Sequence, residues 1–262
     1  MRDVAAWLRG FVLLAASAII SVPALGQDHP VVAAAADLKF AMEEIVQAFA
    51  ANTGKSVRLA FGSSGNFRRQ IAEGAPFEMF MSADEGFVFA LAKEGYTLDE
   101  GTLYAIGRLV IIVPHGSALK ADSELKDLAA GIQDGRVKKF AIANPEHAPY
   151  GRAAQQALIK AGLWDKLQDK LVLGENVSQA TQFATSGSAQ GGIVALSLAR
   201  SPTISKLGDY ALLPAESHEP LRQRMVLLKK AGETAKDFYA FVQRPDARAV
   251  FRRYGFVLPT EQ

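Results

Sequence analysis

The sequence predicts an α/β protein of two lobes, each a mixed, mostly parallel sheet flanked by helices. Three observations support this fold class. Short apolar runs alternate with segments of helical periodicity, the strand–turn–helix order recurs in both halves, and 262 residues suit two lobes of roughly 100–130 residues each. A composition of 49% hydrophobic and 21% charged residues is that of a globular chain, which excludes disordered, collagenous and coiled-coil proteins.

The first half of the chain contains three predicted strand–helix pairs. An apolar strand at 31–35 precedes a helix at 37–51, where apolar side chains recur at helical spacing. Glycine follows this helix, as is common at helix ends. The other two pairs are a strand at 57–61 with a helix at 66–73, and a strand at 79–82 with a helix through 92.

The second half repeats the alternation and predicts the second lobe. Strands are expected at 109–113, 140–143, 171–173, 192–196 and 226–228, with helices near 125–130, 152–161, after 178, at 237–242 and at 247–254. This order predicts one lobe from residues 27–107 plus 222–262 and another from residues 108–221. The strands at 109–113 and 225–228 are the expected crossings between the lobes and form the expected hinge.

The N-terminal segment 1–26 has the layout of a secretory signal peptide. Arg2 and Arg9 make a basic start, residues 11–20 are apolar except for one serine, and small residues precede an expected cleavage after Gly26. The apolar run is shorter than a membrane span requires. The mature protein is therefore expected in the periplasm, and because no cysteine follows the cut, no lipid anchor is expected.

Charge and cysteine content exclude several functional classes. The formal net charge of +2 is too balanced for a protein dedicated to nucleic acid or anionic membranes. The chain has no cysteine, which rules out disulfides, cysteine-ligated metals and thiol nucleophiles.

Four predicted strand-to-helix turns carry small or polar residues. The unpaired N–H groups and positive dipole end of a helix start attract anions, and such turns lie at the carboxyl ends of strands, where ligands bind in α/β sheets. Taken singly, Asp37, Ser64 and Ser178 are better explained as ordinary helix caps. The four turns are Ala36-Asp37, Ser63-Ser64-Gly65, Pro149-Tyr150-Gly151 and Asn176-Val177-Ser178.

Ordered sequence motifs indicate a family. Together they resemble the periplasmic molybdate-binding proteins of ABC importers, over nearly the whole mature chain. The motifs are Phe61-Gly62-Ser63-Ser64-Gly65, Gly74-Ala75-Pro76, Ser82-Ala83-Asp84-Glu85, the segment 144–151, Leu163-Trp164-Asp165-Lys166-Leu167, Gly174-Glu175-Asn176-Val177-Ser178-Gln179-Ala180, Gly192-Ile193-Val194 and Phe251-Arg252-Arg253-Tyr254-Gly255-Phe256.

The resemblance implies a type II periplasmic-binding fold whose lobes close over molybdate or tungstate. Ser64 is expected to bind the oxyanion through its hydroxyl and N–H, and Tyr150 and Val177 through backbone N–H groups. The metal is expected only as the oxyanion, without a cofactor. The implied protein is a monomeric transport component, not an enzyme, and its partners are a membrane permease and its ATPase.

Two positions depart from the family pattern. Asp37 stands where many relatives have Ser, and Ala195 where many have a ligand-binding Tyr; the Tyr150 hydroxyl is a possible replacement for the latter. Because a carboxylate repels a dianion, we expect Asp37 either to cap its own helix, with its N–H facing the ligand, or to accept a hydrogen bond from a protonated oxyanion such as hydrogen phosphate. Lys39 is a candidate to offset its charge.

Two other functions remain as alternatives. One is a binding protein for phosphate or another protonated oxyanion, and the other is a periplasmic enzyme that uses Asp37 or Asp84 as a base on an anionic substrate. His147 is expected to shape its loop, with metal ligation as the alternative.

Overall fold

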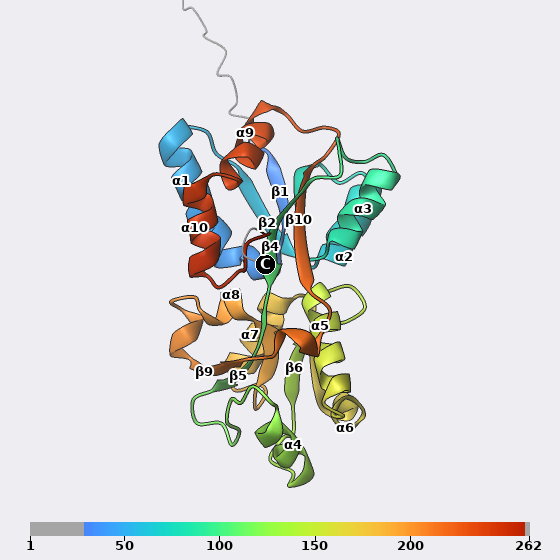
Figure 1. The fold of residues 1–262 in the computed structure, drawn as a ribbon, viewed down its shortest axis with the longest axis vertical. Helices are drawn as coiled ribbons and strands as arrows, with labels where there is room; N and C mark the ends of the chain where they lie inside the picture. The colour runs from blue at the N-terminus through green and yellow to red at the C-terminus, as the bar shows by residue number, and fades with distance from the viewer. Residues whose placement is uncertain (1–28, 260–262) are drawn as a thin grey trace, which may run out of the picture.

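A computed structural model describes residues 29–259 of the chain, so the predicted signal segment 1–26 lies outside the described residues. These residues form two five-stranded sheets, with strand orders β2-β1-β3-β10-β4 and β7-β6-β8-β5-β9. Each sheet and its helices form one lobe, and the two lobes stack along the longest axis of the molecule (Figure 1). The α/β class with two mixed sheets is therefore confirmed.

The first lobe combines the N-terminal and C-terminal parts of the described chain. Strand β1 lies between β2 and β3 and runs parallel to both, whereas β10 lies antiparallel between β3 and β4. In Figure 1, α1, α9 and α10 lie on one side of the sheet and α2 and α3 on the other. The elements are β1 (Val31–Ala35), η1 (Ala36–Leu38), α1 (Lys39–Thr53), β2 (Arg58–Gly62), α2 (Ser64–Ala72), β3 (Phe77–Ser82), α3 (Glu85–Lys93), β4 (Thr102–Gly107), β10 (Leu221–Leu227), α9 (Glu233–Val242) and α10 (Pro245–Arg253).

The second lobe is built from the middle of the chain. Strand β6 runs parallel to β7 and β8, and β5 lies antiparallel between β8 and β9. Its elements are β5 (Leu109–Pro114), α4 (Lys126–Gln133), β6 (Phe140–Ala143), α5 (Pro149–Lys160), α6 (Trp164–Leu167), η2 (Gln168–Lys170), β7 (Leu171–Gly174), α7 (Val177–Thr185), β8 (Gly192–Ala195), α8 (Leu196–Ala199), η3 (Ile204–Lys206), β9 (Gly208–Leu212) and η4 (Ala215–Ser217).

The local sequence explains where the elements begin and end. Strand β1 is almost fully buried, which fits its run of small apolar residues inside a sheet covered by helices. Helix α1 ends at Gly54, whose φ of 69° is a left-handed conformation that glycine adopts without steric cost. Asn176 caps α7 by accepting hydrogen bonds from the N–H groups of Ser178 and Gln179.

The chain passes between the lobes at points other than the expected hinge strands. Strand β4 ends at Gly107 in the first sheet and β5 begins at Leu109 in the second, so the first passage is at Arg108. The return passage is the segment 213–220, between β9 and β10. Residues 109–113 lie within β5, which pairs with β8 and β9, and residues 225–227 lie within β10, which pairs with β3 and β4. Leu228 follows β10 and forms an isolated bridge to Thr97.

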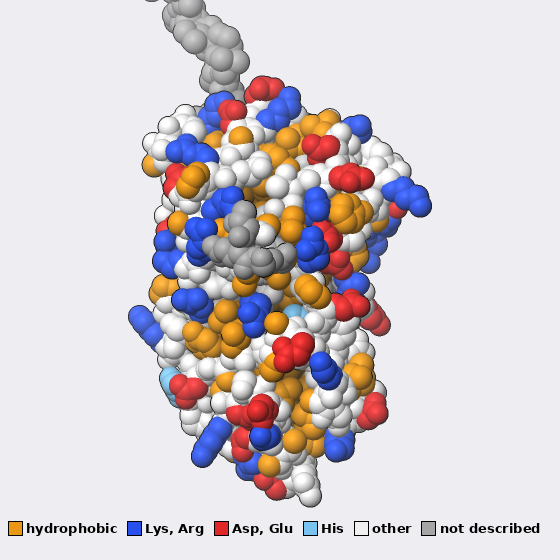
Figure 2. Space-filling view, in the orientation of Figure 1, with side chains coloured by type: hydrophobic (Ala, Val, Ile, Leu, Met, Phe, Trp, Pro, Cys, Tyr) orange, Lys and Arg blue, Asp and Glu red, His pale blue; other side chains and the backbone are white. Residues whose placement is uncertain are grey.

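The surface on the face shown in Figure 2 carries charges of both signs, interspersed without a large area of either. No helix within residues 29–259 is long and apolar enough to cross a membrane.

A candidate anion site between the lobes

Four helix starts from the two lobes converge on one small cavity. The helical segments η1 and α2 contribute from the first lobe, and α5 and α7 from the second. The cavity volume is about 10 Å³, near the minimum that holds one water molecule, so the lobes must part slightly for a larger ion. All four predicted binding residues line it. The lining residues are Ala35, Ala36, Asp37, Gly62, Ser63, Ser64, Ala83, Ala148, Pro149, Tyr150, Asn176 and Val177.

The lining is suited to an anion although it includes no lysine or arginine among residues 29–259. Ser64, Tyr150 and Val177 stand in the first turns of α2, α5 and α7, where backbone N–H groups have no carbonyl one turn earlier to pair with. The positive ends of these helix dipoles add to the same field. The cavity thus offers hydrogen-bond donors and partial positive charge without a cationic side chain.

The Ser64 hydroxyl is oriented by a backbone group. Its Oγ accepts a hydrogen bond from the Ala83 N–H at 2.9 Å, and the residue is fully buried. Because a hydroxyl carries one proton besides its acceptor lone pairs, this contact leaves the Ser64 proton available to an acceptor in the cavity.

The Tyr150 hydroxyl is already engaged. It donates to Asp37 Oδ2 at 3.0 Å and accepts from Gln223 Nε2 at 3.2 Å. Its only proton is therefore used on the carboxylate, and the suggested replacement for the tyrosine absent at Ala195 does not form here. Gly107 leaves the room for this arrangement, because a Cβ at that position would overlap the Tyr150 hydroxyl and lie 2.8 Å from Gln223 Nε2.

Asp37 does not cap its helix, contrary to the first of the two expectations. Segment η1 has no side-chain cap, and the Asp37 side chain turns to Tyr150 and Gln223 because these are the donors that a buried carboxylate needs. Oδ2 accepts from Gln223 Nε2 at 2.6 Å, whereas Oδ1 is buried without a partner. Lys39 does not offset the charge: its Nζ lies 5.5 Å from the Phe40 ring centre, and no salt bridge to Asp37 occurs within residues 29–259.

Burial sets the protonation of Asp37. Desolvation raises the pKa of its carboxyl to about 6, against the smaller lowering effects of the hydrogen bonds from Gln223 and Tyr150. The pKa of the Tyr150 hydroxyl is also raised well above its ordinary value, mainly by desolvation and to a smaller extent by the charge of Asp37. Any anion in the cavity meets this carboxylate, and two unit charges 4 Å apart repel by roughly 4 kcal/mol at an effective dielectric constant of 20.

Sequence reasoning missed the residues that hold Asp37. The Tyr104 hydroxyl donates to Gln223 Oε1 at 2.8 Å, and the Ser197 hydroxyl donates to the Asp37 carbonyl at 2.8 Å. Gln223 is fully buried on the face of β10 that also buries Leu221 and Met225. A glutamine at a position where the alternating pattern of the strand places an apolar side chain was the signal that could have found this residue.

His147 joins the two lobes at the edge of the cavity. Its carbonyl accepts the Gly65 N–H at 3.0 Å, its Nδ1 lies 2.9 Å from Ser63 Oγ, and its Nε2 lies 3.5 Å from Glu175 Oε2. His147 therefore helps to hold the loop against the first lobe, and no group of three or more potential metal ligands occurs within residues 29–259.

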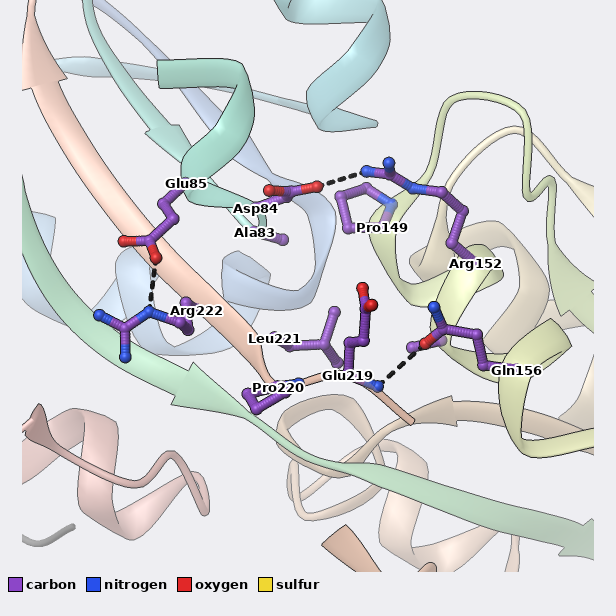
Figure 3. Close-up of a pocket in the computed structure, with 11 residues that line it drawn as sticks. Ala83, Asp84, Glu85, Pro149, Arg152, Gln156, Glu219, Pro220, Leu221 and Arg222 are labelled. Carbon is purple, nitrogen blue, oxygen red and sulfur yellow. Dashed lines mark hydrogen bonds and ion pairs between the residues drawn. The ribbon is translucent and has the colours of Figure 1, made fainter. Parts of the chain in front are cut away.

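A second cavity of about 220 Å³ lies beside the first, and charged groups from both lobes line it (Figure 3). Arg152 of α5 reaches across to Asp84 at 2.5 Å, and Asp84 also caps α3 through the Gly86 N–H. Glu85 pairs with Arg222 at 2.5 Å. Asp84 is thus engaged in an ion pair and a helix cap, which makes it a poor candidate for a catalytic base.

Comparison with known proteins places this arrangement in context. The sequence profile of a family described as bacterial extracellular solute-binding protein matches residues 30–257. The molybdate-binding protein ModA of Rhodobacter capsulatus is 37% identical over 231 residues, which are 87% of each chain. ModA of Escherichia coli is 33% identical over 260 residues, or 96% of this chain and 98% of the relative. The solved structure of the periplasmic molybdate-binding protein of Azotobacter vinelandii superposes with a TM-score of 0.81 and 35% identity, covering 88% of this chain and all of that one.

Proposed function

This chain belongs to the bacterial extracellular solute-binding proteins, and we propose that it captures molybdate, and also tungstate, for an ABC importer. The observation that carries the proposal is the convergence of four helix starts and the Ser64 hydroxyl on one cavity whose lining has no lysine or arginine among the described residues. The molybdate-binding relatives support the choice of ligand.

The ligand is held by donors that are already in place. The Ser64 hydroxyl and the first-turn N–H groups of Ser64, Tyr150 and Val177 donate to the oxyanion oxygens, and the protein never contacts the metal atom directly. Because the donors are fixed by helices and buried from water, they need little reorganisation on binding. Dianions with four acceptor oxygens suit this arrangement of donors, and the lobes part slightly to admit them.

Closure of the lobes completes the site, since donors come from both lobes. The Gly65 N–H contact to the His147 carbonyl and the Asp84–Arg152 ion pair form only when the lobes approach each other. The ligand therefore favours the closed state, which gives the importer a means of recognising the loaded protein.

The cellular role follows from the same proposal. Residues 1–26 direct export and are removed after Gly26, the mature protein acts as a monomer in the periplasm, and it delivers the oxyanion to a membrane permease driven by an ATPase. It catalyses no reaction and holds no cofactor.

A second ligand has one specific observation in its favour. Asp37 lines the cavity, its Oδ1 is buried without a partner, and hydrogen phosphate carries a proton that this oxygen could accept. Phosphate is therefore the alternative ligand of the same site.

Calorimetric titration of the mature protein, stripped of ligand, tests the proposal. Molybdate, tungstate, sulfate and phosphate are titrated separately at pH 6 and pH 7.5. We expect one molybdate or tungstate ion to bind per chain, with sulfate and phosphate much weaker. Phosphate binding with no response to molybdate would establish the alternative ligand instead.

A further inference from the structure

The two carboxyl oxygens of Asp37 differ in their hydrogen bonding. Oδ2 accepts hydrogen bonds from Tyr150 and Gln223, whereas Oδ1 has no partner, and the residue is 1% exposed. Buried polar atoms are nearly always paired in folded proteins, so an orphaned oxygen calls for an explanation. Asp37 also lines the cavity in which the oxyanion is proposed to bind.

Among residues 29–259, no lysine or arginine side chain pairs with Asp37 to balance its charge. Tyr104 of β4, Tyr150 of α5, Gln223 of β10 and Ser197 of α8 face it, and the two tyrosines have pKa values raised by burial and by Asp37 itself. Lys39, on the next helix, lies over the ring of Phe40. A bound dianion would thus meet an ionised carboxylate with no cationic side chain of residues 29–259 and no proton between them.

One proton on the Asp37 carboxyl removes this repulsion, and the hydrogen bonds around the carboxyl indicate which oxygen the proton occupies. Oδ2 already faces an O–H and an N–H donor, so a proton there would meet two others. A proton on Oδ1 meets none, and it converts the orphaned acceptor into a donor toward an oxyanion oxygen.

We propose that the site captures its oxyanion together with one proton, which Asp37 Oδ1 takes from solvent and donates as a hydrogen bond to the ligand. This inference rests on the proposed function and adds Asp37 to it as a residue that determines specificity. One dianion and one proton enter a site that holds one carboxylate, and no covalent bond of the ligand changes.

The ionisation of the empty site makes the step measurable. Burial places the Asp37 pKa at about 6 in the absence of ligand, so at pH 7.5 the carboxyl is almost entirely ionised before binding. Binding then has to draw a proton from the buffer, and affinity falls as the pH rises above 6.

Calorimetric titration of molybdate at pH 7.5, in two buffers of different ionisation enthalpy, counts the protons. We expect uptake of about one proton per molybdate bound, and a dissociation constant that rises about tenfold per pH unit above pH 7 and levels off near pH 6. Molybdate that binds tightly without proton uptake would overturn the inference and leave the proposed function intact. Molybdate that fails to bind at pH 6 would overturn both.

Three variants localise the proton. Asp37→Asn presents an amide donor without a charge, and we expect it to bind without proton uptake and with a flat pH profile. Tyr150→Phe removes a donor that lowers the Asp37 pKa, so proton uptake should persist with the pH profile moved upward. Glu146→Gln changes an exposed carboxyl on the adjoining loop and should keep the wild-type proton count. Undiminished uptake in Asp37→Asn would assign the proton elsewhere and refute the proposal.

Discussion

Replacing Ser64 by alanine tests whether its hydroxyl faces the ligand. In the structure this hydroxyl accepts the Ala83 N–H and keeps its own proton free. A hydrogen bond to a charged group contributes about 1.5–3 kcal/mol, so its loss should weaken molybdate binding roughly 10- to 150-fold. The variant also leaves the buried Ala83 N–H without its partner, which should lower the free energy of unfolding by about 1–3 kcal/mol.

The neighbouring serine supplies the matched control. Ser63 lies one residue earlier, and its hydroxyl pairs with His147 Nδ1 at 2.9 Å. Ser63→Ala therefore loses one neutral hydrogen bond between the lobes, worth about 0.5–1.5 kcal/mol, and should weaken binding only about 2- to 12-fold.

Calorimetric titration of both variants at one pH, with thermal unfolding of the ligand-free proteins, separates the two effects. We expect Ser64→Ala to bind molybdate clearly more weakly than Ser63→Ala. If Ser64→Ala binds within twofold of the unmodified protein while Ser63→Ala is the weaker of the two, the assignment of the Ser64 proton to the ligand is wrong.

Three further predictions concern the network around Asp37 and the ion pair between the lobes. The raised pKa of Asp37 means that the folded state binds more protons than the unfolded state between its ordinary pKa of 3.8 and about 6, so its contribution to stability is present below pH 3.8 and is lost as the pH rises through 6. The loss is about 3 kcal/mol, and urea unfolding of ligand-free Asp37→Asn should show this decline removed; an unchanged pH dependence would contradict the shift. Gly107→Ala should displace the Tyr150 hydroxyl and lower the free energy of unfolding by about 1–3 kcal/mol in the same assay, whereas a stability equal to wild type would mean that the network can shift at no cost. The Asp84–Arg152 ion pair is partly exposed, so we expect it to contribute little to molybdate affinity. A double-mutant cycle with Asp84→Asn and Arg152→Gln should give a coupling energy of at most about 1 kcal/mol, which falls as the salt concentration rises. A larger coupling energy that is insensitive to salt would make the pair a main determinant of closure.

The sequence predicted the local structure around the candidate site. Ser64, Tyr150 and Val177 stand at helix starts after short strands, and both the strands and the small or polar residues of the turns are visible in a window of a few residues. The same reasoning missed strands β4 (Thr102–Gly107) and β9 (Gly208–Leu212). Strand β9 is a partly exposed sheet edge whose side chains show no clear alternation of polar and apolar types.

The contacts of Asp37 could not be predicted because they depend on the tertiary fold. Its partners Tyr150 and Gln223 are 113 and 186 residues away in the chain, and no periodicity relates them. Local reasoning favoured a helix cap, the commonest role of an aspartate before a helix. The buried environment prevailed, because a carboxylate enclosed among apolar residues gains more from two side-chain donors than from a cap that leaves it desolvated.

The position of Asp37 connects the charge of the ligand to the closure of the lobes. Asp37 belongs to the first lobe, Tyr150 to the second, and Gln223 to β10, which follows the passage between them. Both hydrogen bonds to Oδ2 are compatible with a proton on Oδ1, so the contact between the lobes survives when the carboxyl becomes neutral. An ionised Asp37 repels the ligand, whereas a protonated one adds a donor and retains the same contacts. A carboxylate that destabilises the empty protein can therefore favour a closed state that contains both an oxyanion and a proton.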